Sequence, residues 1–256
     1  MNWPLIPALA IAAALFWLGA RRPVPWWVTV PLAAPGVLYA LYYTHLFDDA
    51  IWYCEWRTLP LTELLAGGVG LLAGRLHAWY DPQSLGEKLA APLLAAALVL
   101  VPFIKPLLAP LDTGALHADC PGEVCLQSTL STCGPASAAT LLKRFGIRTS
   151  EQELARECFT YKGGTESWYL ARALRRRGVK ARFVIERGGL PHPAIAGVVL
   201  PGEGLVRGRA GHFIAVLDQT PSTVTIADPL IGRRVLTRDR LGRRYHFTGW
   251  FLVLSN

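Results

Sequence analysis

The chain has 256 residues, of which 52% are hydrophobic and 17% charged. A soluble globular domain carries about 25% charged residues, so this composition argues against an ordinary soluble globular protein. A disordered chain is also excluded, because nine Trp, nine Phe and eight Tyr supply ample apolar area to bury. Residues 1–112 hold six Lys/Arg against seven Asp/Glu, a net of −1, whereas residues 113–256 hold 20 against 11, a net of +9. The sequence therefore predicts two domains, a transmembrane helical domain at 1–112 and a basic domain at 113–256.

Four apolar stretches fill the first domain, at residues 3–20, 24–46, 64–74 and 90–104. A bilayer core about 30 Å thick requires roughly 20 apolar residues in a helix. The first two stretches meet this length, and the other two reach it when their flanking residues are included. We therefore expect an all-α transmembrane bundle of about four helices. A cleaved signal peptide is an alternative for the first stretch, but basic residues follow that stretch rather than precede it.

Basic residues in short loops predict which side of the membrane each loop occupies. The first loop holds Arg21 and Arg22, and two more basic residues flank the third loop, whereas the second loop has three acidic residues against Arg57. Loops one and three are therefore predicted to be cytoplasmic. In a bacterial inner or plasma membrane, this places both termini and the whole basic domain outside the cytoplasm.

The second domain shows helical patterns followed by strand patterns. Helices are predicted at 133–145, 151–157 and 166–177, the second of them capped by Ser150. Strands are predicted at 179–185, 195–200, 212–217, 223–227 and within 244–254, and the third and fourth strands form a hairpin. Because helices come first and strands after, the expected fold class is α+β, with N-terminal helices packed on an antiparallel sheet.

Cys133 is the first candidate catalytic residue. It begins the helix predicted at 133–145, where free backbone N–H groups and the positive end of the helix dipole favour a thiolate, the nucleophilic form of cysteine. Gly134 allows a substrate carbonyl to approach the backbone closely. A buried structural cysteine is the alternative interpretation.

His212 and Asp228 lie on the two strands of the predicted hairpin. With a loop at 219–221, His212 lies directly opposite Asp228. Cross-strand neighbours have Cβ atoms about 5 Å apart, so the carboxylate can orient the imidazole as in a Cys–His–Asp triad. A surface salt bridge is the alternative. Gln127 precedes Cys133 by six residues, and its amide can join the Cys133 backbone N–H in an oxyanion hole.

These residues resemble the double-glycine leader peptidases, papain-like cysteine peptidases best known as the N-terminal domains of bacteriocin exporters. The resemblance covers about residues 124–254. It rests on four motifs in order, namely Gln127 to Ala136, Gly164-Thr165, Gly211-His212-Phe213 and Ala227-Asp228-Pro229. It implies that Cys133 is the nucleophile, His212 the general base, Asp228 the orienting acid and Gln127 the oxyanion-hole side chain.

The order of domains departs from that of the family's exporters. Here the apolar domain precedes the peptidase-like region, and no G-x-x-x-x-G-K-[ST] motif marks an ATPase. We therefore expect no transport by this polypeptide alone and consider a separate ABC-type exporter as its partner. The family's peptidases usually face the cytoplasm, which conflicts with the location that the loop charges predict.

The predicted function is a membrane-anchored cysteine endopeptidase that cleaves a peptide bond in a peptide or leader-bearing precursor, after a double-glycine type of site if the family's rule applies. Two alternatives stay open. One is a non-catalytic module that binds a peptide for a separate transporter, and the other is an acyl transferase that uses the same triad.

The remaining residues with distinctive chemistry give weaker signals. Cys120 and Cys125 flank a Pro-Gly turn and form either a disulfide, which an extracytoplasmic location permits, or two unrelated thiols. The Cys and His spacings lack the paired ligands of a zinc site, so we expect no metal and no cofactor. The arginines of the second domain indicate solvated faces or contacts with lipid headgroups, and we expect no nucleic acid as partner because no aromatic recognition motif is found.

Overall fold

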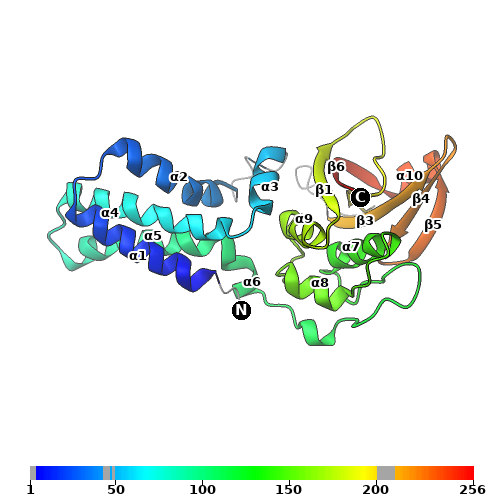
Figure 1. Ribbon diagram of the computed structural model, residues 1–256, viewed down its shortest axis with the longest axis horizontal. Helices are drawn as coiled ribbons and strands as arrows, with labels where there is room; N and C mark the ends of the chain where they lie inside the picture. The colour runs from blue at the N-terminus through cyan, green and yellow to red at the C-terminus, as the bar shows by residue number, and fades with distance from the viewer. Residues whose placement is uncertain (1–3, 43–46, 48–49, 201–210) are drawn as a thin grey trace. The chain divides into compact units, whose positions relative to one another are not determined.

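The computed structural model describes residues 4–42, 47, 50–200 and 211–256 (Figure 1). The chain divides into two compact units. Residues 1–47 and 60–108 belong to one unit, and residues 48–59 and 109–256 belong to the other. Two acidic residues of the predicted second loop, Asp48 and Asp49, lie outside the described residues, as do residues 43–46 at the end of the second predicted membrane stretch.

The described part of the first unit is entirely helical, in agreement with the expected all-α N-terminal domain. Its elements are α1 (Leu5–Arg21), α2 (Trp26–Tyr42), the 3-10 helix η1 (Thr62–Gly68), α4 (Val69–Tyr80), α5 (Leu85–Leu100), the 3-10 helix η2 (Val101–Phe103) and α6 (Ile104–Leu108). Helix α4 packs along α1 and against α5. The last three elements form one apolar helix of 24 residues, Leu85–Leu108, which is long enough to cross a membrane.

The number of helices that can span a membrane is smaller than the four that the sequence predicts. Among the described residues, Leu85–Leu108 alone meets the length by itself, and a second span results only if the short helix at 51–58 and the helix at 62–80 form one broken span. Helices α1 and α2 are apolar but have 17 residues each.

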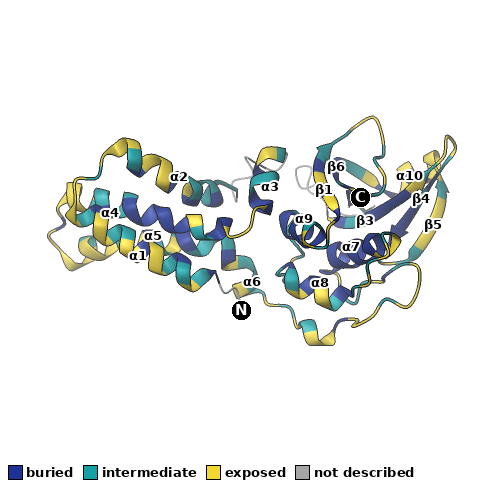
Figure 2. Ribbon diagram, in the orientation of Figure 1, coloured by how far each residue is buried: buried dark blue, intermediate teal, exposed yellow. Residues whose placement is uncertain are grey.

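Small residues fill the contacts between these helices, whereas many large apolar residues are exposed. Figure 2 shows buried and exposed positions alternating along α1, α2, α4 and α5. A Cβ atom added to Gly70 or Gly74 of α4 would come within 2.0 Å of the Ala12 carbonyl oxygen or 2.2 Å of the Phe16 carbonyl oxygen in α1. The exposed side chains include Trp17, Trp27, Leu93 and Leu94. Close backbone contact through glycine, with bulky apolar residues on the outside, is typical of helices that pack in lipid.

The second unit has the predicted α+β fold. Its helices are α3 (Ile51–Thr58), the 3-10 helix η3 (Thr113–Ala115), α7 (Cys133–Arg144), α8 (Glu151–Glu157), α9 (Ser167–Arg176) and α10 (Arg238–Arg244). Its strands are β1 (Lys180–Ile185), β2 (Ala194–Val199), β3 (His212–Gln219), β4 (Thr223–Asp228), β5 (Gly232–Thr237) and β6 (His246–Ser255). They form one antiparallel sheet in the order β1-β6-β2-β3-β4-β5. Strand β5 and helix α10 were not predicted from the sequence.

Helices cover both faces of this sheet. Helix α7 packs on β2, β3 and β4, and α9 packs against α7 and β1. On the opposite face, Leu241 of α10 and Tyr245 join a buried apolar cluster with alternate residues of β2, β3 and β4, among them Ile214 and Ile226. Ser150 caps α8 as predicted, because its hydroxyl accepts a hydrogen bond from the Glu153 N–H at 3.1 Å.

The hairpin of β3 and β4 differs from the predicted register. Ala215 pairs with Ala227, whereas a direct His212–Asp228 pair requires Ala215 to face Thr225. The turn lies further along the chain than predicted, at residues 220–223, and a bulge interrupts β3. The predicted register is therefore wrong by two residues. Because side chains alternate along a strand with a period of two, this even shift keeps His212 and Asp228 on the same face.

Helix α3 belongs to the second unit, although in the sequence it lies between two segments of the first. The buried Arg172 of α9 donates hydrogen bonds to carbonyl groups at the C-terminal end of α3, including that of Leu59 at 2.8 Å. Glu55 of α3 accepts a hydrogen bond from the Phe183 N–H at 3.1 Å. Phe183 lies in β1, at the edge of the sheet, so Glu55 satisfies a backbone donor that the sheet leaves unpaired.

Candidate active site

Cys133 is the first residue of α7 and is only 6% exposed. The Ser137 hydroxyl, one turn further along α7, donates a hydrogen bond to the Phe213 carbonyl of β3 at 3.2 Å, which fixes the helix beside the strand that begins with His212. Gly134 is buried among side chains, because an added Cβ would lie 2.9 Å from Leu170 Cδ1. The small size of Gly134 thus serves packing inside the domain.

His212 and Asp228 form a buried pair. His212 Nε2 lies 2.8 Å from Asp228 Oδ1, and the two residues are 4% and 2% exposed. Cys133 lies close enough to the imidazole to raise the pKa of His212. Since Nε2 faces Asp228, Nδ1 is the ring nitrogen left for the thiol. The structure therefore brings together Cys133, His212 and Asp228, which the sequence singled out, although the two strand residues meet diagonally instead of face to face.

Both oxygens of the Asp228 carboxylate have hydrogen-bond donors. The Leu230 N–H donates to Oδ1 at 2.9 Å, and the Tyr245 hydroxyl donates to Oδ2 at 2.6 Å. The Leu230 contact is an Asx turn, which the Asp-Pro-Leu sequence after β4 is suited to form. Tyr245 is 1% exposed. Tyr245 was not predicted from the sequence, because no local pattern connects a residue before the last strand with an aspartate 17 positions earlier.

These contacts set the protonation of the site. Burial by itself lowers the pKa of His212, but the hydrogen bond to Asp228 and the contact with Cys133 outweigh it and raise the pKa to about 9. Burial by itself raises the pKa of Asp228, but hydrogen bonds from His212, Tyr245 and the Leu230 N–H lower it. Burial and the contact with Asp228 raise the pKa of Tyr245 to about 12. At neutral pH the site therefore holds an imidazolium, a carboxylate and a protonated tyrosine.

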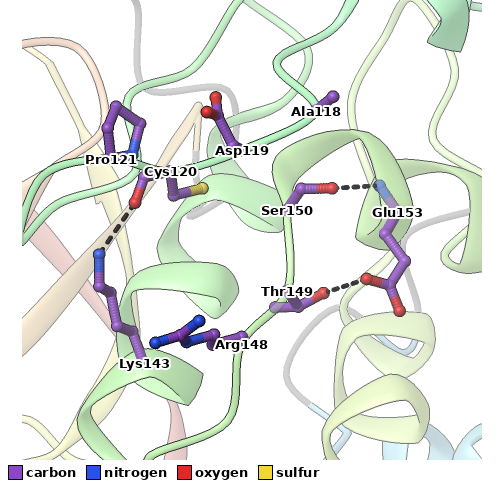
Figure 3. A pocket seen from close by; sticks show the side chains of 9 residues that line it. All are labelled: Ala118, Asp119, Cys120, Pro121, Lys143, Arg148, Thr149, Ser150 and Glu153. Carbon is purple, nitrogen blue, oxygen red and sulfur yellow. Dashed lines mark hydrogen bonds between the residues drawn. The ribbon is translucent and has the colours of Figure 1, made fainter.

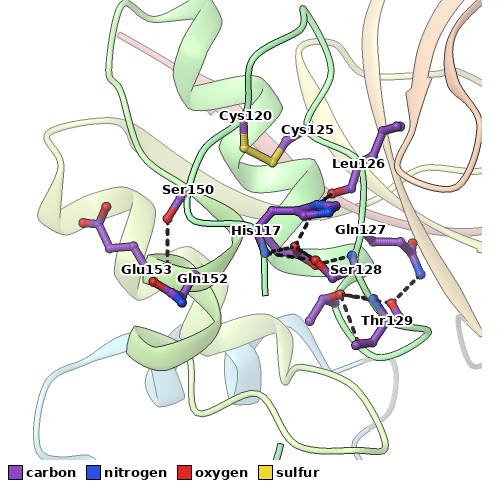
Figure 4. A network of polar contacts seen from close by, with 12 residues as sticks. His117, Cys120, Cys125, Leu126, Gln127, Ser128, Thr129, Ser150, Gln152 and Glu153 are labelled. Atoms are coloured by element: carbon purple, nitrogen blue, oxygen red, sulfur yellow. Dashed lines mark hydrogen bonds and ion pairs between the residues drawn. A yellow bond between two sulfur atoms is a disulfide. The ribbon is translucent and has the colours of Figure 1, made fainter. Parts of the chain in front are cut away.

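Gln127 lies next to the turn that follows Asp228. Its backbone N–H donates to the Pro229 carbonyl at 3.0 Å. Its side-chain Nε2 donates to the Thr129 carbonyl at 2.7 Å (Figure 4). An amide NH₂ group has two hydrogens, and one of them is used in this bond. The structure thus ties Gln127 to the end of β4.

The segment that carries Gln127 is anchored on both sides. Cys120 and Cys125 form a disulfide (Figure 4), so of the two alternatives left by the sequence the structure has the bonded one. The Cys125 N–H donates to Thr140 Oγ1 of α7 at 2.9 Å. On the other side, the Ser128 N–H donates to the fully buried Glu151 carboxylate at 2.6 Å.

A separate pocket of about 490 Å³ lies beside the disulfide (Figure 3). Cys120, Lys143, Arg148 and Glu153 are among its lining residues, whereas Cys133 and His212 are not. Within the part of the chain that the structure describes, no three His, Cys, Asp or Glu side chains are grouped so that they could hold a metal ion. The other free cysteines, Cys54 and Cys158, are buried.

A cysteine that begins a helix packed on an antiparallel sheet, together with a His–Asp pair on the strands, is the arrangement of the papain-like cysteine peptidases. The chain belongs to the Peptidase C39 family, whose family model matches residues 122–256.

Two proteins from Methanothermobacter are each similar to about half of the chain. An uncharacterized protein of Methanothermobacter marburgensis is 36% identical over 130 residues, which is 50% of this chain and 85% of the relative. An uncharacterized protein of Methanothermobacter thermautotrophicus is 33% identical over 133 residues, which is 52% of this chain and 87% of the relative.

Among solved structures, the chain is similar to the peptidase domain of Streptococcus ComA, a bi-functional ABC transporter involved in a quorum-sensing pathway. The identity is 22%, the TM-score is 0.43, and the match covers 54% of this chain and 98% of that one. A double-glycine motif protease from an AMS/PCAT transporter, in complex with the leader peptide, is 19% identical with a TM-score of 0.43, over 54% of this chain and 94% of that one.

Proposed function

We propose that the protein is a membrane-anchored cysteine endopeptidase that cleaves a peptide bond in a peptide or leader-bearing precursor through a Cys133–His212–Asp228 triad. The observation that carries the proposal is the buried His212–Asp228 hydrogen bond of 2.8 Å beside Cys133, in a chain of the Peptidase C39 family. A merely structural cysteine needs neither a charged imidazole nor a buried carboxylate beside it.

In the proposed mechanism, the proton of Cys133 already resides on His212, which is an imidazolium at neutral pH, and the thiolate attacks the scissile carbonyl carbon. The resulting oxyanion accepts hydrogen bonds from the Cys133 backbone N–H and the second amide hydrogen of Gln127. The imidazolium then gives its proton to the leaving amine, and a thioester forms at Cys133. Water that loses its proton to His212 hydrolyses the thioester, which restores the thiolate of Cys133 beside the His212 imidazolium. Asp228 keeps the imidazole oriented throughout.

The substrate follows from the motifs rather than from the geometry. The four motifs shared with the double-glycine leader peptidases support a leader-bearing peptide that is cleaved after a double-glycine type of site. A separate ABC-type exporter is the partner that such a substrate implies. The 1–112 region is proposed to supply the membrane domain, except for residues 48–59, which fold with the second unit, and 113–256 is proposed to be the peptidase domain.

Membrane anchoring is supported by the apolar helix Leu85–Leu108 and by the exposed apolar side chains of the first unit. Residues 48–59 and 109–256 share one compact unit, and the proposal places these two segments on the same side of the membrane. The sequence charges put both segments outside the cytoplasm. The Cys120–Cys125 disulfide supports the same location, since disulfides persist in oxidising compartments.

Cleavage of synthetic peptides tests the proposal. Full-length protein in detergent is incubated with a panel of leader peptides that contain a Gly-Gly site, and the product masses are measured. We expect products whose masses equal those of hydrolysis, and their loss in Cys133→Ala. The matched control is Cys54→Ala, which removes another buried cysteine and retains cleavage. Equal cleavage by Cys133→Ala would overturn the assignment, and products that carry an added amine would indicate acyl transfer.

A further inference from the structure

We propose that Tyr245 is a positioning residue of the catalytic pair, whose hydroxyl fixes the Asp228 carboxylate in the plane that receives the His212 imidazolium. The role rests on the proposed function, because it acts through the triad. It extends the chain of contacts from Cys133, His212 and Asp228 to a fourth buried side chain.

The division of contacts over the two carboxylate oxygens carries the proposal. Oδ1 of Asp228 accepts from His212 at 2.8 Å and from the Leu230 N–H at 2.9 Å, whereas Oδ2 accepts from Tyr245 at 2.6 Å. The terminal torsion of an aspartate is soft. With donors on Oδ1 alone the carboxylate can rotate about that contact, and Tyr245 stops the rotation by holding the second oxygen.

The hydrogen of the Tyr245 hydroxyl has a single direction available. Arg244 Nε lies 3.3 Å from the hydroxyl oxygen. An arginine has donors and no acceptor, so the hydroxyl accepts from Arg244 and must give its own hydrogen to Asp228. The cationic neighbour also polarises the O–H bond toward the carboxylate. Tyr245 is therefore a donor of defined orientation.

The backbone and ring of Tyr245 are held as firmly as its hydroxyl. Its N–H donates to the Leu241 carbonyl at 2.9 Å, where α10 ends. Its ring lies in the buried cluster with Leu241, Ile226 and Phe251. Helix α10 and the start of β6 thus place the hydroxyl, which gives these elements a role in the site although neither supplies a triad residue.

Two readouts test the role, and one of them does not depend on cleavage. Tyr245→Phe removes only the hydroxyl, and Tyr169→Phe, at another buried tyrosine, in α9, is the matched control. For leader-peptide cleavage we expect Tyr245→Phe to lower kcat about 10- to 100-fold, the range for a lost buried hydrogen bond to a charged group, with KM changed less than about twofold. Tyr169→Phe keeps kcat within about twofold.

The second readout is the pH dependence of Cys133 alkylation by iodoacetamide, followed by peptide mass spectrometry. Without the Tyr245 donor the Asp228 carboxylate binds a proton more readily, so the acid limb of the alkylation profile moves to higher pH. In an Asp228→Asn background, Tyr245→Phe should change neither kcat nor the alkylation profile, because the hydroxyl acts only through the carboxylate.

An unmoved acid limb in Tyr245→Phe, or the same loss of kcat in both backgrounds, would overturn the positioning role. If no peptide is cleaved while Cys133 alkylation still depends on Tyr245, the proposed function fails and the positioning role stands. The two hypotheses are therefore distinguishable in one set of variants.

Discussion

The charged state of His212 links the stability of the protein to pH, and the variant His212→Gln isolates this link. Contacts with Asp228 and Cys133 raise the pKa of the imidazole from 6.5 to about 9, although burial opposes the charge. Each pKa unit corresponds to about 1.4 kcal/mol, so the difference amounts to about 3 kcal/mol of free energy of unfolding. The side chain is almost fully buried, so solvent screens this contribution little.

The sign follows from which state binds the proton more tightly. The folded state has the higher pKa, so the contribution is fully present below about pH 6.5, where His212 is charged in both states. It declines as the pH rises and is lost above about pH 9, where both states are neutral. The lowered pKa of Asp228 acts at the acidic end of the scale and does not change this window.

Urea unfolding of the full-length protein in detergent, followed by tryptophan fluorescence between pH 6 and 10, measures the effect. The parent should lose about 3 kcal/mol of unfolding free energy across this window relative to His212→Gln. Asp228→Asn should show a smaller decline than the parent, because the main hydrogen-bond acceptor of the imidazolium is gone. Parallel pH curves for the parent and His212→Gln would refute the reasoning.

Three further predictions concern the oxyanion hole, the α3 contact and the membrane orientation. Gln127→Ala should lower kcat for leader-peptide cleavage about 100- to 1000-fold with little change in KM, and an unchanged kcat would exclude Gln127 from the oxyanion hole. Arg172→Met should lower the free energy of unfolding, measured by urea titration, by about 3–5 kcal/mol, because it leaves buried carbonyl groups of α3 without a hydrogen-bond donor. A change below about 1 kcal/mol would show that α3 does not depend on this contact. Cysteine introduced as Arg187→Cys should react with a membrane-impermeant thiol reagent on intact cells, whereas Arg22→Cys should react only after permeabilisation, and the opposite pattern would reverse the proposed orientation.

Local patterns along the chain predicted most of the elements that carry the site. Helix α7 begins at Cys133, α8 is capped by Ser150, and β3 begins at His212, all as expected. These features depend on capping side chains, proline and glycine positions and the alternation of apolar residues. Such signals act within a few residues, so the sequence contains them in readable form.

The hairpin shows where local patterns stop being sufficient. The predicted turn was displaced along the chain, and the register was wrong by two residues. Polar residues around Gln219 and Ser222 permit several turns of similar stability, and only the packing of β3 and β4 between their neighbours selects one. The two side chains still meet despite the wrong register, because an even shift keeps both on the same face of the sheet.

The α+β class, the division into an apolar part and a basic part, and the candidate residues Cys133, His212, Asp228 and Gln127 follow from the sequence alone. The contact of Tyr245 with Asp228 and the place of α3 in the unit that contains the sheet become visible only in the folded chain. The difference lies in the range of the interactions. Caps and strand alternation arise between near neighbours, whereas a buried hydroxyl finds a carboxylate, and Arg172 finds the carbonyl groups of α3, only after distant segments have packed together.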